Sequence, residues 1–290
     1  MRLRRIGIVG LALAAATAAR AQLDVSLRLP MARALLYEPL PAQLTVRNLT
    51  DEALTLDETN APAQLRLDIE SQPGRLVART AEPLPDTPWT LPARGTLQRT
   101  VNLTPLFELR RTGPYTVAAQ IIVGDRSYGS RRLFLDIVPG FELGRLEARL
   151  SGGAGRRTYT LRSLHRDRHD RLFIYIEDED AQINYGVLDL GTLVRLYDPM
   201  LLADGAGRAH VLHGSAPGRY TYSILTPDGR PAEQKYYAAT ADAPALEMDT
   251  AGRVQVRGLA PYEGEIIAVP PAARGRPFAP PSDPKKTFGN

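Results

Sequence analysis

The chain has 290 residues, a formal net charge of +4, no cysteine and a single tryptophan. Four of its 36 basic residues but none of its 32 acidic residues lie in the first 21 positions, so the rest of the chain holds 32 of each sign. This balance excludes the basic surface that a nucleic-acid partner requires, and the lack of cysteine excludes disulfides, thiolate metal sites and thiol nucleophiles.

The first 21 residues predict a cleavable secretory signal peptide. Three arginines in the first five positions precede an apolar run, and Ala19-Arg20-Ala21 places small residues at the two positions that a signal peptidase reads. The uncharged stretch from Ile6 to Ala19 is about 14 residues long, shorter than the roughly 18–20 that span a bilayer. We therefore expect cleavage after Ala21, a periplasmic or extracellular location and no membrane span in the mature chain.

Residues 22–138 show the period-2 alternation of half-buried strands. Val25, Leu27 and Leu29 alternate with polar residues, for example, and no helical period is convincing in this part of the chain. Further strands separated by Pro, Gly, Asn and Asp are expected at residues 43–48, 53–57, 65–70, 75–79, 96–103, 115–123 and 131–138. About eight antiparallel strands in a block of this length predict a β-sandwich.

A more specific pattern lies at the end of this block. A short crossing segment starting at Leu103 leads to a turn and then to Gly113-Pro-Tyr115-Thr-Val117. In immunoglobulin-like sandwiches a tyrosine in this position bonds back to the crossing segment, which is called the tyrosine corner. Residues 23–138 therefore resemble a bacterial secreted immunoglobulin-like domain. They also resemble, more faintly, the small β-sandwich family typified by an intracellular bacterial proteinase inhibitor.

Residues 139–144 are expected to form a linker, and residues 145–269 a second antiparallel β domain. Asp204–Gly207 and Asp249–Gly252 are similar turns that each precede an arginine and an outgoing strand, and His169 begins a related segment. The spacings of 37 and 45 residues resemble those of β-propeller blades. Only about two and a half units fit, whereas closed propellers have about four or more blades. A second sandwich is favoured, and a propeller-like open sheet is the alternative.

The last 21 residues lose this pattern. Five prolines in the segment 270–281 precede a polar end, which predicts a disordered or polyproline tail over residues 270–290.

Trp89, His165 and His169 are the candidate binding-surface residues. An exposed Trp89 in its Pro-rich loop would mark a binding surface, whereas a buried one would only anchor the loop. His165 and His169 lie near two aspartates, and these four side chains together could bind a divalent metal. Three arginines in the same segment, however, would repel a cation. An exposed hairpin turn is therefore the favoured interpretation of this segment.

Two other clusters contain residues that could form a metal site or a carbohydrate-binding surface. His210 and His213 lie three apart on a predicted strand, where period-2 geometry sends them to opposite faces, so they cannot share a metal unless the strand bulges. Tyr220 and Tyr222 alternate on one face with Ile224, which favours a core position over a carbohydrate-stacking platform. We expect no catalytic residue, no metal and no cofactor.

The sequence thus predicts an exported, non-enzymatic binding or structural module that mediates protein interactions in the bacterial envelope or outside the cell. Such contacts would use sandwich loops or an exposed edge strand. One alternative is a carbohydrate-binding protein that acts through the C-terminal β domain. Another is a proteinase-inhibitor-like module with an exposed, extended loop on the first domain. The expected partner is an unidentified protein or a polysaccharide.

Overall fold

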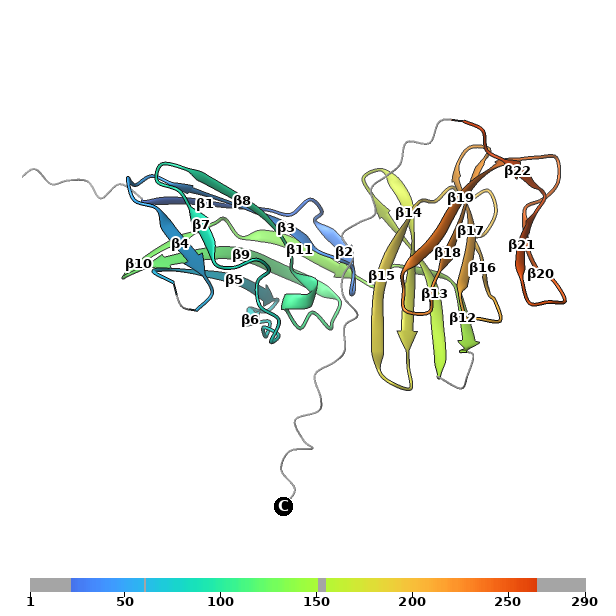
Figure 1. Ribbon diagram of the computed structural model, residues 1–290, viewed down its shortest axis with the longest axis horizontal. Coiled ribbons are helices and arrows are strands. Elements are labelled where there is room, and N and C mark those ends of the chain that lie inside the picture. The colour runs from blue at the N-terminus through green and yellow to red at the C-terminus, as the bar shows by residue number, and fades with distance from the viewer. Residues whose placement is uncertain (1–21, 60, 151–154, 265–290) are drawn as a thin grey trace, which may run out of the picture.

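The computed structural model describes residues 22–59, 61–150 and 155–264, so the predicted signal peptide and Pro-rich tail lie outside the described residues. Within these ranges the chain consists of β-strands, turns and one short 3₁₀ helix, η1 (Thr104–Leu106). No helix in this part of the chain is long and apolar enough to cross a membrane. The strands form two blocks that follow one another along the chain (Figure 1). The predicted all-β fold class is confirmed.

The first block contains a three-stranded and an eight-stranded sheet. The smaller sheet has the order β1-β3-β8, with β1 at Leu23–Arg28, β3 at Pro41–Asn48 and β8 at Thr96–Asn102. The larger sheet has the order β2-β11-β9-β5-β4-β7, with β6 and β10 attached to β5 and β9. Its strands are β2 (Arg33–Leu35), β4 (Leu54–Asp57), β5 (Ala63–Ser71), β6 (Arg75–Leu76), β7 (Trp89–Leu91), β9 (Gly113–Val123), β10 (Arg126–Gly129) and β11 (Leu133–Val138).

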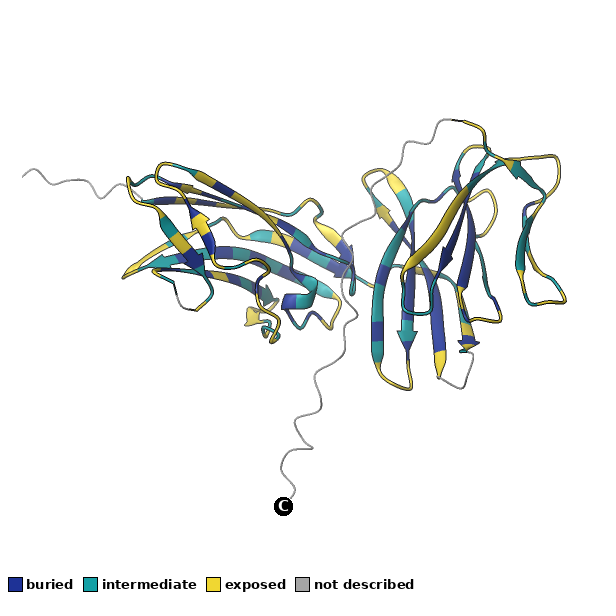
Figure 2. Cartoon of the chain, in the orientation of Figure 1, coloured by how far each residue is buried: buried dark blue, intermediate teal, exposed yellow. Residues whose placement is uncertain are grey.

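In this block, the alternation of apolar and polar residues in the sequence corresponds to an alternation of buried and exposed side chains. Every second residue of β1, β3 and β9 is buried, and these inward side chains form a single core between the two sheets (Figure 2). All eight predicted strands are present. The strands β2, β7 and β10 were not predicted, because segments of three or four residues are too short to show a period.

The tyrosine corner is also present. The buried Tyr115 donates its phenolic proton to the backbone carbonyl of Arg111 at 2.7 Å, just after the crossing segment that contains η1. This bond closes the turn before β9, as the resemblance to immunoglobulin-like sandwiches implies.

The second block has three layers. The first is a sheet of the consecutive strands β12 (Phe141–Arg149), β13 (Arg156–Arg166), β14 (His169–Asp178) and β15 (Ile183–Thr192). The second is a sheet of the order β16-β17-β18-β19-β22, with bounds β16 (Met200–Ala203), β17 (Ala209–Ala216), β18 (Arg219–Leu225), β19 (Pro231–Ala239) and β22 (Leu259–Pro261). The third is the hairpin of β20 (Ala245–Met248) and β21 (Val254–Arg257).

The two larger sheets of this block pack face to face. Buried residues of both sheets, among them Tyr159 and Ile174 from one and Val211 and Leu225 from the other, belong to a single core. The favoured sandwich therefore describes this block better than the propeller-like open sheet. The hairpin layer was not predicted.

The connection between the blocks is shorter than the predicted linker 139–144. Strand β11 ends at Val138 and β12 already begins at Phe141, because residues from Phe141 onward pair with β13. The remaining link includes Gly140, whose φ of +72° suits glycine. A Cβ atom there would lie 2.7 Å from Leu35 Cδ2 and 3.1 Å from the Ser163 carbonyl oxygen, so the junction is closely packed on both sides.

A small core and a buried ion pair join the two blocks. Leu35 of the first block packs with Phe173 and Tyr175 of the second. Beside them, Arg166 Nη1 and Nη2 donate to Glu38 Oε1 and Oε2 at 2.8 and 2.7 Å, and the two side chains are only 10% and 6% exposed. The interface between the blocks thus contains packed apolar side chains and a buried ion pair.

Candidate functional site

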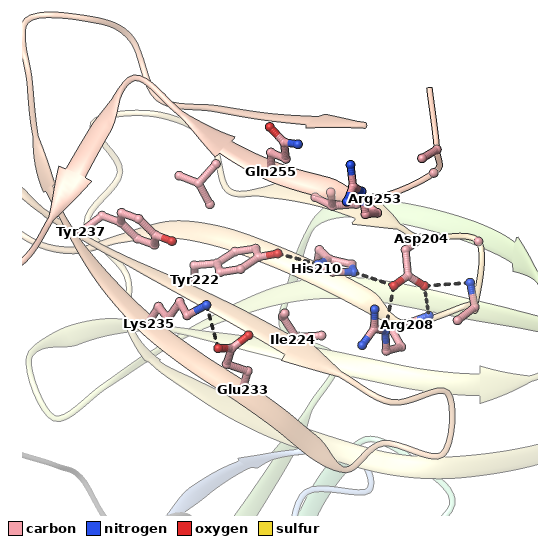
Figure 3. Close-up of a pocket in the computed structure, with 16 residues that line it drawn as sticks. Asp204, Arg208, His210, Tyr222, Ile224, Glu233, Lys235, Tyr237, Arg253 and Gln255 are labelled. Atoms are coloured by element: carbon pink, nitrogen blue, oxygen red, sulfur yellow. Dashed lines mark hydrogen bonds and ion pairs between the residues drawn. The ribbon is translucent and has the colours of Figure 1, made fainter. Parts of the chain in front are cut away.

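A pocket of about 580 Å³ opens between the outer face of the five-stranded sheet and the β20–β21 hairpin (Figure 3). The hairpin is fixed over this face because Leu246 and Val256 pack against Leu212 and Tyr220 of the sheet. The volume lies within the roughly 300–1,000 Å³ that is usual for small-molecule sites. This pocket is the candidate functional site.

A chain of three hydrogen-bonded side chains runs along the floor of the pocket. His210 on β17 lies between Asp204, at the end of β16, and Tyr222 on β18. The His210 Nε2 atom is 3.1 Å from Asp204 Oδ2, and its Nδ1 atom is 2.6 Å from the Tyr222 hydroxyl oxygen. All three side chains are buried, and Figure 3 shows them in line.

The environment of each group fixes the position of the protons. Burial raises the pKa of Tyr222 to about 12, with contributions from Tyr237 and Glu233, so its hydroxyl is protonated and donates to His210 Nδ1. Burial lowers the pKa of His210, and Asp204 offsets this only in part, so the imidazole is neutral and donates from Nε2 to Asp204. Burial raises the pKa of Asp204, but hydrogen bonds from His210 and Arg208 outweigh it and the net pKa is lowered.

Two turns of the same construction line the pocket. In Asp204–Arg208 the aspartate Oδ1 accepts the backbone N–H groups of Ala206 and Arg208, and Oδ2 accepts Arg208 Nε at 2.7 Å. In Asp249–Arg253 the same atoms make the same bonds, with Arg253 Nε at 2.9 Å. The repeated turn that the sequence predicts is confirmed at these two places. Each of the two turns closes a β-hairpin and places one arginine in the pocket lining.

The remaining lining combines polar groups, an aromatic ring and aliphatic side chains. Glu233 and Lys235 of β19 form an ion pair at 2.7 Å, and Gln255 of β21 lines the same space. The Tyr237 ring lies edge-on to Tyr222, with 6.3 Å between the ring centroids. The aliphatic part of the wall includes Ile224, Val254 and Val256.

Both nitrogens of His210 are engaged within the protein, and Tyr222 holds its proton far above neutral pH. Across the described ranges no group of three or more His, Asp or Glu side chains is placed to hold a metal ion.

The structure corrects the expectation that Trp89 contributes to a binding surface. Its side chain is 2% exposed and its Nε1–H donates to the Pro85 carbonyl oxygen at 3.1 Å. The ring anchors the Pro-rich loop because strand β7, which contains it, turns it into the core between the sheets.

His165 and His169 lie on an exposed hairpin, as favoured. The turn between β13 and β14 is made by Asp167 and Arg168, both with positive φ, which is typical of a two-residue hairpin loop. His165 Nδ1 is 2.9 Å from Asp170 Oδ1, and the two histidines belong to no metal-binding group in the described residues. Both stay candidate surface residues.

The other histidines and tyrosines are buried. His210 lines the pocket on the outer face of β17, whereas His213, three residues on, lies on the opposite face, as period 2 predicts. Tyr220 and Tyr222 are buried, so no exposed tyrosine platform exists at these two positions. From the sequence, His210 is placed only in relation to His213. Asp204, at the start of the repeated turn and in the same hairpin, was the feature that would have indicated its partner.

The first domain does not present the free, extended loop that a proteinase inhibitor would need in the segment between β6 and β7. Leu84 is buried there, and its backbone N–H donates to Glu58 at 2.9 Å. Arg79 also binds Glu58, so the loop is tied to the body of the domain.

Comparisons with known proteins leave the function open. No known protein family matches the sequence, and no curated protein matches it. Solved structures with some similarity include the periplasmic chaperone SfaE, with 13% identity and a TM-score of 0.24, covering 72% of this chain and 97% of the chaperone. Another is a DUF4784 family protein from Bacteroides caccae ATCC 43185, with 8% identity and a TM-score of 0.20, covering 81% of this chain and 84% of that one.

The fold and the pocket together define an all-β protein of sandwich-like domains, with a polar pocket under a hairpin of its second domain.

Proposed function

We propose that this protein is an exported, non-enzymatic binding module that takes a hydroxyl-rich ligand, a saccharide, in the pocket of its second domain. The observation that supports this most is the lining itself. Gln255, Lys235 and Glu233 provide hydrogen-bond donors and acceptors around the half-buried ring of Tyr237. A saccharide presents hydroxyl groups to such polar atoms and C–H faces to an aromatic ring.

The hydrogen-bonded floor supports binding without turnover. The Asp204–His210–Tyr222 chain holds its three side chains in one arrangement, and an ordered polar surface reduces the entropy lost on binding. We therefore expect the bound saccharide to be recovered intact.

The test is an isothermal titration with a panel of neutral and acidic oligosaccharides. The change Tyr237→Ala removes the aromatic wall and is expected to weaken binding about tenfold, because an aromatic contact with its burial contributes on the order of 1–1.5 kcal/mol. The matched control is Tyr236→Ala, since Tyr236 is the next residue of β19 and does not line the pocket. No binding by the wild-type protein, or an equal loss in Y236A, would contradict the proposal.

A second candidate function, interaction with another protein, is favoured by an exposed apolar patch at the start of β12. Phe141 and Leu196 are 63% and 72% exposed, and Tyr197 is also exposed. The segment that contains Leu196 lies near Phe141, since the guanidinium of the preceding residue, Arg195, is 5.7 Å from the Phe141 ring centroid. Strand β12 is an edge strand of its sheet.

We expect the double change Phe141→Ser and Leu196→Ser to abolish co-purification of a specific envelope protein that the wild-type chain retains. Mass spectrometry of the retained material gives the measurement. Phe134, a phenylalanine of the first domain that is 54% exposed, provides the control F134S. If F134S loses the same protein, or if wild type and double variant retain the same set, the patch is not an interface.

A further inference from the structure

The two arginines that the repeated turns bring to the pocket are each held through one edge of the guanidinium. Arg208 and Arg253 each use Nε to bind the aspartate of their own turn. Neither of their terminal amino groups, Nη1 and Nη2, donates a hydrogen bond to any residue in the described ranges. Each guanidinium is therefore held in place at one edge while its outer edge stays available.

The position of these outer edges is set by the pocket. Both arginines line it, and in Figure 3 they lie on either side of the Asp204–His210 pair. They come from different layers, Arg208 from the turn before β17 and Arg253 from the turn before β21. A ligand that enters between the sheet and the hairpin thus meets a guanidinium from each layer.

The open edges of the two guanidinium groups favour an anion. The charges themselves balance, because Arg208, Arg253 and Lys235 are paired with Asp204, Asp249 and Glu233. Asp204 already accepts four hydrogen bonds, so the outer Nη atoms of the arginines are the charged donors that face a ligand. The planar fork of arginine matches the two oxygens of a carboxylate, in a geometry that a lysine cannot reproduce.

We propose that the pocket selects an acidic saccharide, a uronic-acid type of sugar, whose carboxylate is held between Arg208 and Arg253. This inference rests on the proposed function and names its ligand class. The sugar hydroxyls would meet Gln255 and the Glu233–Lys235 pair, and the ring would lie against Tyr237. The two repeated turns therefore have a function beyond hairpin closure, since each orients one half of an anion clamp.

The experiment compares two oligosaccharides that differ only in the acid group, an oligogalacturonate and a neutral galactose oligomer of the same length. Wild type is expected to bind the acidic one at least tenfold more tightly. Arg208→Gln and Arg253→Gln are each expected to lose this preference by about tenfold or more, since hydrogen bonds to a charged group are about twice as strong as neutral ones. Their affinity for the neutral oligomer should fall less than their affinity for the acidic one.

The chain provides a matched control in its third turn of this kind. Thr226–Arg230 closes β18 and β19 with the same backbone bond, and Arg230 binds Asp228 at 2.8 Å but does not line the pocket. R230Q should bind both oligosaccharides as wild type does. The lysine variants R208K and R253K keep the charge and lose the fork. If they retain the full preference, a bidentate clamp is excluded.

Thermal melts of every variant show whether the pocket is still folded, so that a lost affinity is not mistaken for unfolding. Equal affinity of wild type for the two oligosaccharides would overturn the clamp and leave the saccharide pocket standing. Binding of neither would remove both proposals. A loss in R230Q as large as that in R208Q would also overturn the clamp, because it would show a general effect of charge.

Discussion

Replacing Glu38 by Gln should destabilise the protein by about 3–5 kcal/mol and uncouple its two domains. Arg166 would then keep its charge in a site where its side chain is only 10% exposed, and a buried charge without its partner costs about this much. Glu38 also accepts the backbone N–H of Leu35 at 2.8 Å, so the change weakens the turn that follows β2. Urea denaturation followed by tryptophan fluorescence and by far-UV circular dichroism measures both effects.

The two probes separate the domains. Trp89 lies in the core of the first domain, so its fluorescence follows that domain, whereas circular dichroism follows all strands. We expect coincident transitions in wild type and separate ones in E38Q, because the ion pair and the small core around Phe173 are what join the two units. The double change Glu38→Leu with Arg166→Met should recover most of the lost stability, since it leaves no buried charge.

A matched control distinguishes burial from ion pairing as such. Arg132 and Glu70 form another two-bond pair, at 2.6 and 3.0 Å, but Arg132 is largely exposed. R132Q is expected to cost less than about 1 kcal/mol, as exposed pairs usually do. If E38Q costs no more than R132Q, or if wild type already unfolds in two steps, the junction does not hold the domains together.

The first domain was predictable from sequence because its strands are buried on one face only. In β3, Ala42, Leu44 and Val46 point inward and the residues between them face outward. The alternation of apolar and polar residues in the sequence therefore predicts which side chains are buried. The second domain has strands such as β14, in which five consecutive residues from Leu172 to Ile176 are buried. Such a run shows that a strand exists but not which layer covers each face.

The pocket could not be predicted from the sequence, for a related reason. Asp204, His210 and Tyr222 come together only because β17 pairs with β18 in one particular register and the hairpin covers their outer face. Local patterns predicted the turn at Asp204 and the alternation at Tyr222, but not the pairing that brings them into line. The ion pair of Glu38 and Arg166 is similar, since 128 residues separate its partners. Trp89 shows the opposite error, because a Pro-rich context does not reveal that the ring points inward.

The free energy of unfolding should decrease as the pH falls below about 6.5, because of His213. This side chain lies on the inner face of β17 and is almost completely buried, and its hydrogen bond to the backbone of Thr192 offsets only part of the effect of burial. Burial lowers its pKa from 6.5 to about 4. The unfolded chain therefore takes up a proton near pH 6.5 while the folded protein does not, and the stability contributed by the neutral imidazole is lost as the pH falls from 6.5 toward 4. This amounts to roughly 3 kcal/mol.

His213→Leu is expected to remove that part of the pH dependence while leaving the protein about as stable at pH 7, because it replaces a buried imidazole, whose one polar partner is the Thr192 backbone, by an apolar group. The pKa of His210 is also lowered by burial, so wild type and H213L both retain its smaller effect in the same direction. Urea titrations at several pH values between 4 and 7 give the difference between the two proteins, which should grow as the pH falls. H169L, a change at the exposed hairpin turn, should follow wild type throughout. Parallel curves for wild type and H213L would mean that His213 reaches solvent or a partner in the folded protein, and the tightly packed inner face of β17 would have to be revised.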